Sequence, residues 1–218
     1  MKKLTLLSLF FLCGLMTFAQ KHVPCTVEYD NGDKKDYYFN GKLVNIFGND
    51  YKATLTLYDA SSNKIKVKVA DIKEITFTGD EDGTAVVFYA KGYMGNAFGK
   101  PSKNLSSEKT PFMVLYRDDD ITVAKQRISV YSQGTWTTYD YYYYLKAGEN
   151  YPKFVLLAVV GGTIGWETLL RNSLARYFSD CPQLVARIKK GEFNVKYRDF
   201  GVENLVEVYK AYLSYKKR

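Results

Sequence analysis

The feature that most constrains the fold is a change of hydrophobic period near Gly161 and Gly162. Before this point the chain consists of short stretches rich in Val, Ile, Thr, Tyr and Phe, separated by turn residues, which is typical of antiparallel strands. After it, apolar residues recur every three or four positions, which is the period of an amphipathic helix. The sequence therefore predicts an α+β protein, with a β-rich domain over residues 20–160 and a helical C-terminal segment over residues 161–218.

The clearest hairpin joins residues 54–58 to residues 65–69 through a polar loop, and both runs alternate between apolar and polar side chains. The segment 92–110 combines glycine, proline, lysine and serine without a sustained period, so we interpret it as a long surface loop. Many short strands joined by turns predict an antiparallel β sandwich or a partly open barrel. Further strands are expected at residues 23–29, 37–39, 72–77, 85–90, 112–116, 121–130, 137–146 and 154–160.

Three helices are expected after the glycine pair, over residues 166–178, 182–190 and 202–213. Ser179 and Asp180 are candidate capping residues for the second helix, which a proline opens. Three short helices bury too little apolar surface to make a robust domain alone. We therefore expect their apolar faces to pack on the β part.

The start of the chain has the pattern of a signal peptide. Two lysines precede an almost unbroken apolar run over residues 4–18, and small residues occupy the positions that a signal peptidase recognises. The run is too short for a transmembrane anchor, which needs about 20 apolar residues. We predict removal of residues 1–19 and a mature chain that begins at Gln20. Lipidation at Cys13 is the alternative, although Leu12 stands where a lipoprotein signal normally has a small residue. The expected location is therefore the periplasm, the outer surface or the medium.

Basic residues exceed acidic ones, with 31 Lys plus Arg against 23 Asp plus Glu, and the excess lies mainly in the helical segment. A nucleic-acid-binding surface would need a continuous stripe of cations or a known motif. The only dense cluster is Lys216, Lys217 and Arg218 at the end of the last expected helix, where cations favour the negative end of the helix dipole. We interpret the excess as a solvated helical face. The expected partners include neither nucleic acid nor, after signal removal, an integral membrane span.

The mature chain keeps two cysteines, Cys25 and Cys181, and one histidine, His22. Two cysteines in an exported protein can oxidise, so the pair is either joined in a disulfide or consists of two buried thiols. The cysteines have no Cys-x-x-Cys spacing, and one histidine supplies too few ligands for a zinc site. We expect no metal and no cofactor.

Three other segments allow both a functional and a structural interpretation. The acidic clusters at residues 80–83 and 118–120 could hold calcium, but each stands between strand-like runs and is explained more simply as a hairpin turn. The glycine-rich segment 159–165 could cradle a phosphate at a helix N-terminus. Its spacing matches no phosphate-binding motif, which favours a flexible joint between strand and helix.

The expected strand 137–146 is the most aromatic segment of the chain. In an extended conformation Tyr141 and its alternate neighbours share a uniformly apolar face, which we expect in the core. The opposite face mixes polar residues with Tyr142 and Tyr144, so we expect it to meet solvent. These two tyrosines form a candidate binding site for a sugar ring or a protein partner. The alternative, which the residue pattern favours, is that they cover a sheet or the docked helices.

The segment Tyr177–Leu184, with the sequence YFSDCPQL, follows an export signal and a strand-rich middle and precedes a terminal amphipathic helix. This order resembles small secreted proteins of unknown function from Gram-negative bacteria. In that pattern the last helix ends in Tyr-Asn and a cysteine, whereas no cysteine follows Tyr209 here. The departure leaves Cys25 as the possible partner of Cys181 within the mature chain. The resemblance implies location and architecture, not activity.

Catalysis has little support in the sequence. A catalytic triad would have to use His22, which lies close to the expected new N-terminus, where chains are often mobile. We therefore expect an exported noncatalytic binding or structural protein of the bacterial envelope, with a protein, a peptide or a glycan as partner. The alternative is a carboxylate-dependent envelope hydrolase, which would need two convergent carboxylates in a cleft.

Overall fold

The fold was analysed in a computed structural model. It describes residues 22–41, 53–80, 83–95, 100–132, 134–159, 165–194 and 201–216. The expected signal peptide, its cleavage site and most of the glycine-rich segment lie outside these residues. No helix within them is long and apolar enough to cross a membrane.

Twelve strands and three α-helices make up the described part of the chain, so the predicted α+β class is confirmed. A short 3-10 turn, Val69–Asp71, precedes the fifth strand. The first six strands are β1 (His22–Tyr29), β2 (Lys34–Asn40), β3 (Thr54–Tyr58), β4 (Lys64–Lys68), β5 (Ile72–Asp80) and β6 (Gly83–Ala90). The other six are β7 (Tyr93–Gly95), β8 (Pro101–Leu105), β9 (Thr110–Arg117), β10 (Ile121–Ser132), β11 (Thr135–Lys146) and β12 (Lys153–Val159).

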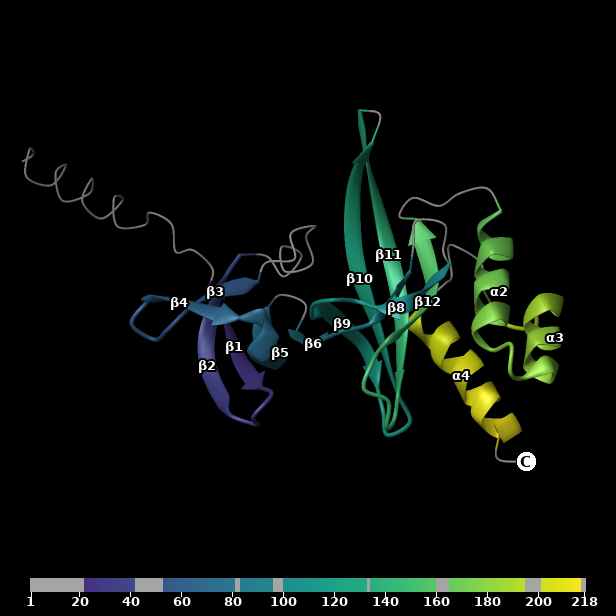
Figure 1. The fold of residues 1–218 in the computed structure, drawn as a ribbon, viewed down its shortest axis with the longest axis horizontal. Helices are drawn as coiled ribbons and strands as arrows, with labels where there is room; N and C mark the ends of the chain where they lie inside the picture. The colour runs from purple at the N-terminus through teal and green to yellow at the C-terminus, as the bar shows by residue number, and fades with distance from the viewer. Residues whose placement is uncertain are drawn as a thin grey trace, which may run out of the picture.

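All twelve strands belong to one sheet, in the order β4-β3-β2-β1-β5-β6-β9-β10-β11-β12-β7-β8. Neighbours are antiparallel except β12 and β7, which meet in a parallel pair. The sheet has two ends, β4 and β8, and three lysines along β4 discourage pairing with another strand at that edge. In Figure 1 the first strands and the helices lie at opposite ends of the molecule, and the β10–β11 hairpin extends beyond its neighbours.

Two of the three helices contact one face of the sheet, near β9, β10 and β12, and the remaining helix packs on those two. They are α2 (Trp166–Tyr177), α3 (Pro182–Lys190) and α4 (Val202–Lys216), which agree closely with the predicted spans. Cys181 is the N-cap of α3, without a side-chain capping bond, so the prediction that Ser179 or Asp180 caps this helix is wrong. Gly191 ends α3 with φ of 77°, a left-handed conformation that glycine adopts without strain.

Three apolar clusters form the core, and β11 shows how the sheet separates two of them. Tyr143 and Tyr144 are both fully buried although they point to opposite faces, as neighbours on a strand must. Tyr144 packs beneath the helices with Leu174 and Leu205. Tyr143 packs on the other face with Phe112, Phe154 and Met94. The third cluster lies in the N-terminal strands around Val27, Leu57 and Phe77.

The segment 92–110 differs from the predicted surface loop. Residues 93–95 and 101–105 are the strands β7 and β8, which pair with each other and extend the sheet beyond β12. These strands are rich in serine, lysine and glycine and have no apolar period, so the sequence pattern does not predict them. They form because they pair with a strand that is distant in the sequence.

Candidate functional site

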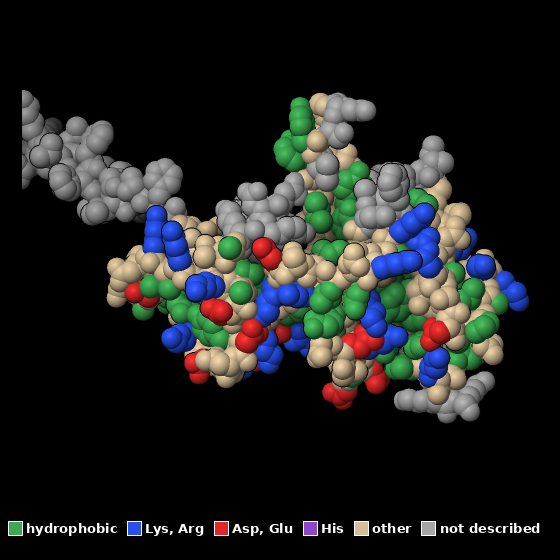
Figure 2. Space-filling model, viewed as in Figure 1, with side chains coloured by type: hydrophobic (Ala, Val, Ile, Leu, Met, Phe, Trp, Pro, Cys, Tyr) green, Lys and Arg blue, Asp and Glu red, His purple; other side chains and the backbone are tan. Residues whose placement is uncertain are grey.

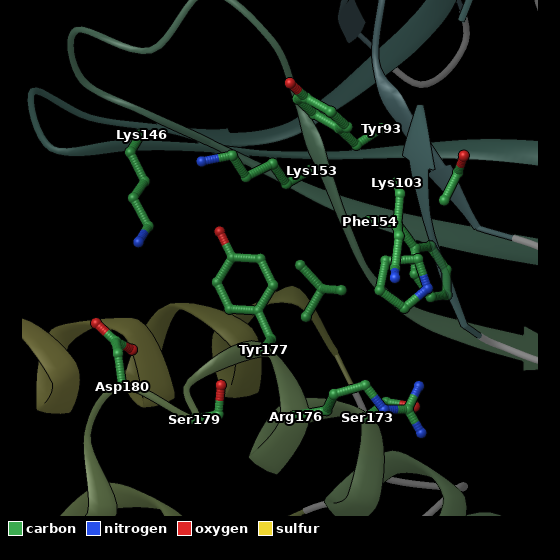
Figure 3. Close-up of a pocket in the computed structure, with 13 residues that line it drawn as sticks. Tyr93, Lys103, Lys146, Lys153, Phe154, Ser173, Arg176, Tyr177, Ser179 and Asp180 are labelled. Carbon is green, nitrogen blue, oxygen red and sulfur yellow. The ribbon is translucent and has the colours of Figure 1, made fainter. Parts of the chain in front are cut away.

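A pocket of about 530 Å³ lies between the last strands of the sheet and helix α2. Its sheet side is formed by β7, β8, β12 and the end of β11. The principal side chains there, shown in Figure 3, are Tyr93, Lys103, Lys146, Lys153 and Phe154.

The opposite side of the pocket comes from α2 and from the turn that leads into α3. Residues three and four apart on a helix share a face, which brings Ser173, Arg176 and Tyr177 of α2 to the same wall. Ser179 and Asp180 follow directly after the helix and complete this side. The pocket therefore exists only because the helical segment docks on the sheet.

A close approach between β7 and β12 positions the part of the pocket wall that β7 forms. Tyr93 is the register partner of Lys153, and the Tyr93 amide donates a hydrogen bond of 2.9 Å to the Pro152 carbonyl. A Cβ atom on Gly95 would lie 2.5 Å from the Phe154 ring, which is far inside van der Waals contact. Glycine at this position thus lets β7 lie against the Phe154 side chain.

Positive charge dominates the lining of the pocket. Four cationic side chains, Lys103, Lys146, Lys153 and Arg176, face one carboxylate, that of Asp180. Figure 2 shows Lys and Arg side chains gathered over the area where β8 and α2 lie in Figure 1. A concave site with an excess of one charge sign concentrates ions of the opposite sign. The lining is therefore suited to an anion.

Lys146 is the most unusual of these cations. Its Nζ atom lies 5.5 Å from the ring centroid of Tyr177 and 4.8 Å from that of Tyr212. Its side chain is half-buried, and it has no ion pair within 4.0 Å among the carboxylates of the described residues. Burial lowers the pKa of this ammonium. Aromatic faces attract the cation but leave its hydrogen-bond donors unused.

The Tyr177 hydroxyl lies beside this ammonium in Figure 3 and points between Lys146 and Lys153. Its oxygen is buried and has no hydrogen-bond partner within the described part of the chain. Burial, and then the charge of Glu149, raises the pKa of Tyr177, so the hydroxyl stays protonated. Lys153 donates a hydrogen bond of 2.7 Å to Glu149, which partly balances its charge. An unsatisfied buried hydroxyl costs about 1–3 kcal/mol, which an acceptor group beside it would recover.

Two side chains of α4 hold the Asp180 carboxylate. The Tyr212 hydroxyl donates to its Oδ2 atom at 2.6 Å, and Lys216 Nζ lies 2.9 Å from the same atom. Partial burial opposes ionisation of Asp180, but these two partners hold the pKa of its carboxyl below the usual value. Asp180 therefore stays ionised, and it can accept a hydrogen bond from a ligand.

The predicted binding tyrosines lie elsewhere. Tyr144 is 0% exposed, its ring contacts Tyr177 and Tyr209, and its hydroxyl donates a bond of 2.6 Å to the Leu205 carbonyl. Tyr142 is half-buried against the same cluster, and burial raises its pKa to about 12. The expectation that this strand face meets solvent is wrong for Tyr144, because α2 and α4 cover it. The alternative, in which these tyrosines pack under docked helices, describes the structure.

The two cysteines are separate free thiols. Cys25 and Cys181 are both buried, the first in the N-terminal cluster and the second beneath the helices. The structure therefore does not form the disulfide considered from the sequence, and the alternative of two buried thiols applies. Burial raises the pKa of Cys25 to about 12, which keeps this thiol protonated.

The acidic cluster at residues 118–120 forms a turn in the structure. Asp118 Oδ1 accepts backbone hydrogen bonds from Asp120 and Ile121 at the start of β10. The other cluster, residues 80–83, lies partly outside the described residues. Within the described ranges no group of three or more His, Cys, Asp or Glu side chains is arranged to hold a metal ion.

In comparisons with known proteins, no family model, curated protein or solved structure matches the chain.

Sequence reasoning missed every cation of the pocket. Lys103 and Lys146 are separated by 43 positions, and Arg176 lies on a helix that sequence analysis could place only in general terms on the β part. Two sequence features could have indicated a cationic site: the lysines of segment 92–110 and the basic excess of the helical segment 161–218. Their convergence depends on β7 and β8 joining the sheet beyond β12.

Proposed function

We propose that this chain is an exported, noncatalytic protein that binds a small anionic ligand in the pocket between β8, β12 and α2. The observation that carries the proposal is Lys146, a half-buried ammonium with no carboxylate within 4.0 Å among the described residues, beside the Tyr177 hydroxyl, which has no hydrogen-bond partner among them. A carboxylate, sulfate or phosphate group would accept hydrogen bonds from both side chains, with little rearrangement of the rigid elements that carry them. Export to the periplasm, the outer surface or the medium rests on the N-terminal sequence pattern. Mass spectrometry of the exported chain should find Gln20 at its N-terminus.

The fold supplies a rigid frame for such a site. Phe88, Phe112, Tyr143 and Phe154 come from four strands and contact one another on the face opposite the helices. We propose that these strands, with β7 and β8 folded along β12, form the partly open barrel expected from the sequence. The pocket then lies at its outer wall, where the helices dock.

The hydrolase alternative receives no comparable support. Hydrolysis by paired carboxylates needs two groups about 5–10 Å apart that face the same bond. Among the described residues that line the pocket there is one carboxylate, Asp180, and that group is held by Tyr212 and Lys216. Binding without turnover is therefore the function that the pocket supports best.

Isothermal titration calorimetry of the purified protein tests the proposal, with galacturonate and sulfate as separate probes and neutral galactose as the comparison. We expect the anions to bind and galactose not to bind, with affinity that falls as salt rises. Lys146→Gln should weaken galacturonate binding by about tenfold, since one charge-assisted hydrogen bond is lost. The matched control, Lys66→Gln on the exposed face of β4, should bind like the parent protein. If neither anion binds, or if both lysine variants weaken binding equally, the proposal is wrong.

A further inference from the structure

The four cations of the pocket form two pairs, and this division says more about the ligand. Figure 3 shows Lys146 and Lys153 on one side of the cavity and Lys103 and Arg176 on the other. The first pair is half-buried near the turn between β11 and β12, whereas Lys103 and Arg176 are exposed. We refer to Lys146 and Lys153 as the inner pair and to Lys103 and Arg176 as the outer pair.

Apolar surface separates the two pairs. In Figure 3 the Tyr177 ring lies between them, and Val155 and Phe154 also line the pocket. One small anion cannot contact both pairs across this surface, because each hydrogen bond requires a donor and an acceptor within about 3 Å. A ligand that uses all four cations must carry two anionic groups joined by a spacer that packs on the aromatic ring.

The polar groups around the spacer restrict its chemistry. Ser173 and Ser179 contribute hydroxyls, and the Asp180 carboxylate is an acceptor only. A hydrocarbon spacer would cover the serine hydroxyls without giving them hydrogen-bond partners, at a cost in free energy. A saccharide offers hydroxyl donors to Asp180 and acceptors to the serines, while the apolar face of its ring packs on an aromatic side chain such as Tyr177.

On the basis of the proposed function, we infer that the ligand is an acidic saccharide with two anionic groups, one at the inner pair and one at the outer pair. A dimer of uronic acids is a simple probe that carries two acid groups on neighbouring sugar rings. Its second acid group binds as an intramolecular partner of the first, so it adds affinity without a second loss of translational freedom.

Calorimetry with a matched set of ligands tests this inference. The probes are digalacturonate, monomeric galacturonate, a neutral galactose disaccharide, and adipate as a dicarboxylate without hydroxyls. We expect digalacturonate to bind at least tenfold more tightly than galacturonate and adipate, and the neutral disaccharide not to bind. Equal affinity for digalacturonate and galacturonate would overturn the inference while the proposed function stands. Adipate binding as tight as digalacturonate would overturn the saccharide assignment, and no acid binding at all would overturn both proposals.

Two lysine variants assign the two acid groups to their pairs. Lys103→Gln should weaken digalacturonate binding by about tenfold and change galacturonate binding by no more than about twofold, because the monomer occupies the inner pair. Lys146→Gln should weaken both ligands. Lys66→Gln is again the control, and thermal melts of all variants check that each one folds. If Lys103→Gln leaves digalacturonate affinity unchanged in a folded protein, the outer pair does not contact the ligand and the inference fails.

Discussion

At the residue scale, the site is defined by a half-buried ammonium and by a buried hydroxyl that has no hydrogen-bond partner among the described residues. Lys146 and Tyr177 come from a strand end and a helix end, and their contact is an aromatic one at 5.5 Å. The local alternation of residues 137–146 correctly predicted that Tyr141 and Tyr143 are buried. It failed at Tyr144, because a strand pattern with two tyrosines among polar residues does not reveal that helices cover that face.

The lowered pKa of Lys146 predicts the pH dependence of ligand binding. An anion binds the protonated ammonium, so affinity is complete below the pKa of Lys146 and falls as pH rises through it. Because burial lowers that pKa, galacturonate affinity should fall at a pH below the value of about 10.4 that an ordinary lysine would set. Calorimetry across alkaline pH measures this, and Lys146→Arg, which stays charged, should keep its affinity. An identical alkaline loss in the arginine variant would show that another group titrates.

Tyr144 has a structural role that truncation reveals. Tyr144→Ala should lower the free energy of unfolding by about 3–5 kcal/mol, because it removes a fully buried ring from beneath the helices. Tyr144→Phe should cost about 1–3 kcal/mol, since the Leu205 carbonyl loses its donor. Urea denaturation measures both values. The control is Tyr131→Ala at a position 60% exposed, which should change stability far less; a similar loss at both positions would contradict the buried role of Tyr144.

At the element scale, the sequence predicted the strong elements and missed the weak ones. The helical spans and most strands follow their own hydrophobic period, so their limits differ from the expected ones by only a few residues. The strands β7 and β8 have no such period. They form because β7 pairs with β12 and β8 pairs with β7. They carry one side of the pocket, which explains why the site could not be derived from the sequence.

Gly95→Ala tests the contact that holds β7 against β12. The added Cβ would overlap the Phe154 ring, so β7 must shift, and we expect a loss of about 1–3 kcal/mol in the free energy of unfolding. The shift should also weaken digalacturonate binding, because Lys103 of the outer pair lies on the adjoining strand β8. Combining it with Phe154→Leu gives the Cβ room and should recover part of the binding. Unchanged stability and binding in Gly95→Ala would contradict the close approach.

At the scale of the whole molecule, one sheet connects an N-terminal core to a second core beneath the helices. This arrangement keeps Cys25 and Cys181 in different clusters, so spacing along the chain gave no basis for deciding whether they meet. The α+β class followed from the change of period at residue 161. The convergence of β8, β12 and α2 on one pocket is a property of the whole fold.

The separate cores predict the behaviour of the two thiols. In the native protein both should react slowly with a thiol reagent, because both are buried, and in denaturant both should react rapidly without prior reduction. Mass spectrometry of the labelled, unreduced protein counts the modified cysteines. Cys25→Ser and Cys181→Ser identify which thiol reacts. A denatured protein that accepts label only after reduction would contain the disulfide and contradict this account.

The pocket between β8, β12 and α2 should bind an anion. A titration of the isotope-labelled protein with galacturonate, followed by amide chemical shifts in NMR, tests this directly, with galactose as the control. We expect the shift changes to cluster at residues 146–155 and 173–180, and to be strongly reduced in Lys146→Gln. Changes that cluster instead in β1 to β5 or near the exposed Trp136, or no changes at all, would contradict the account.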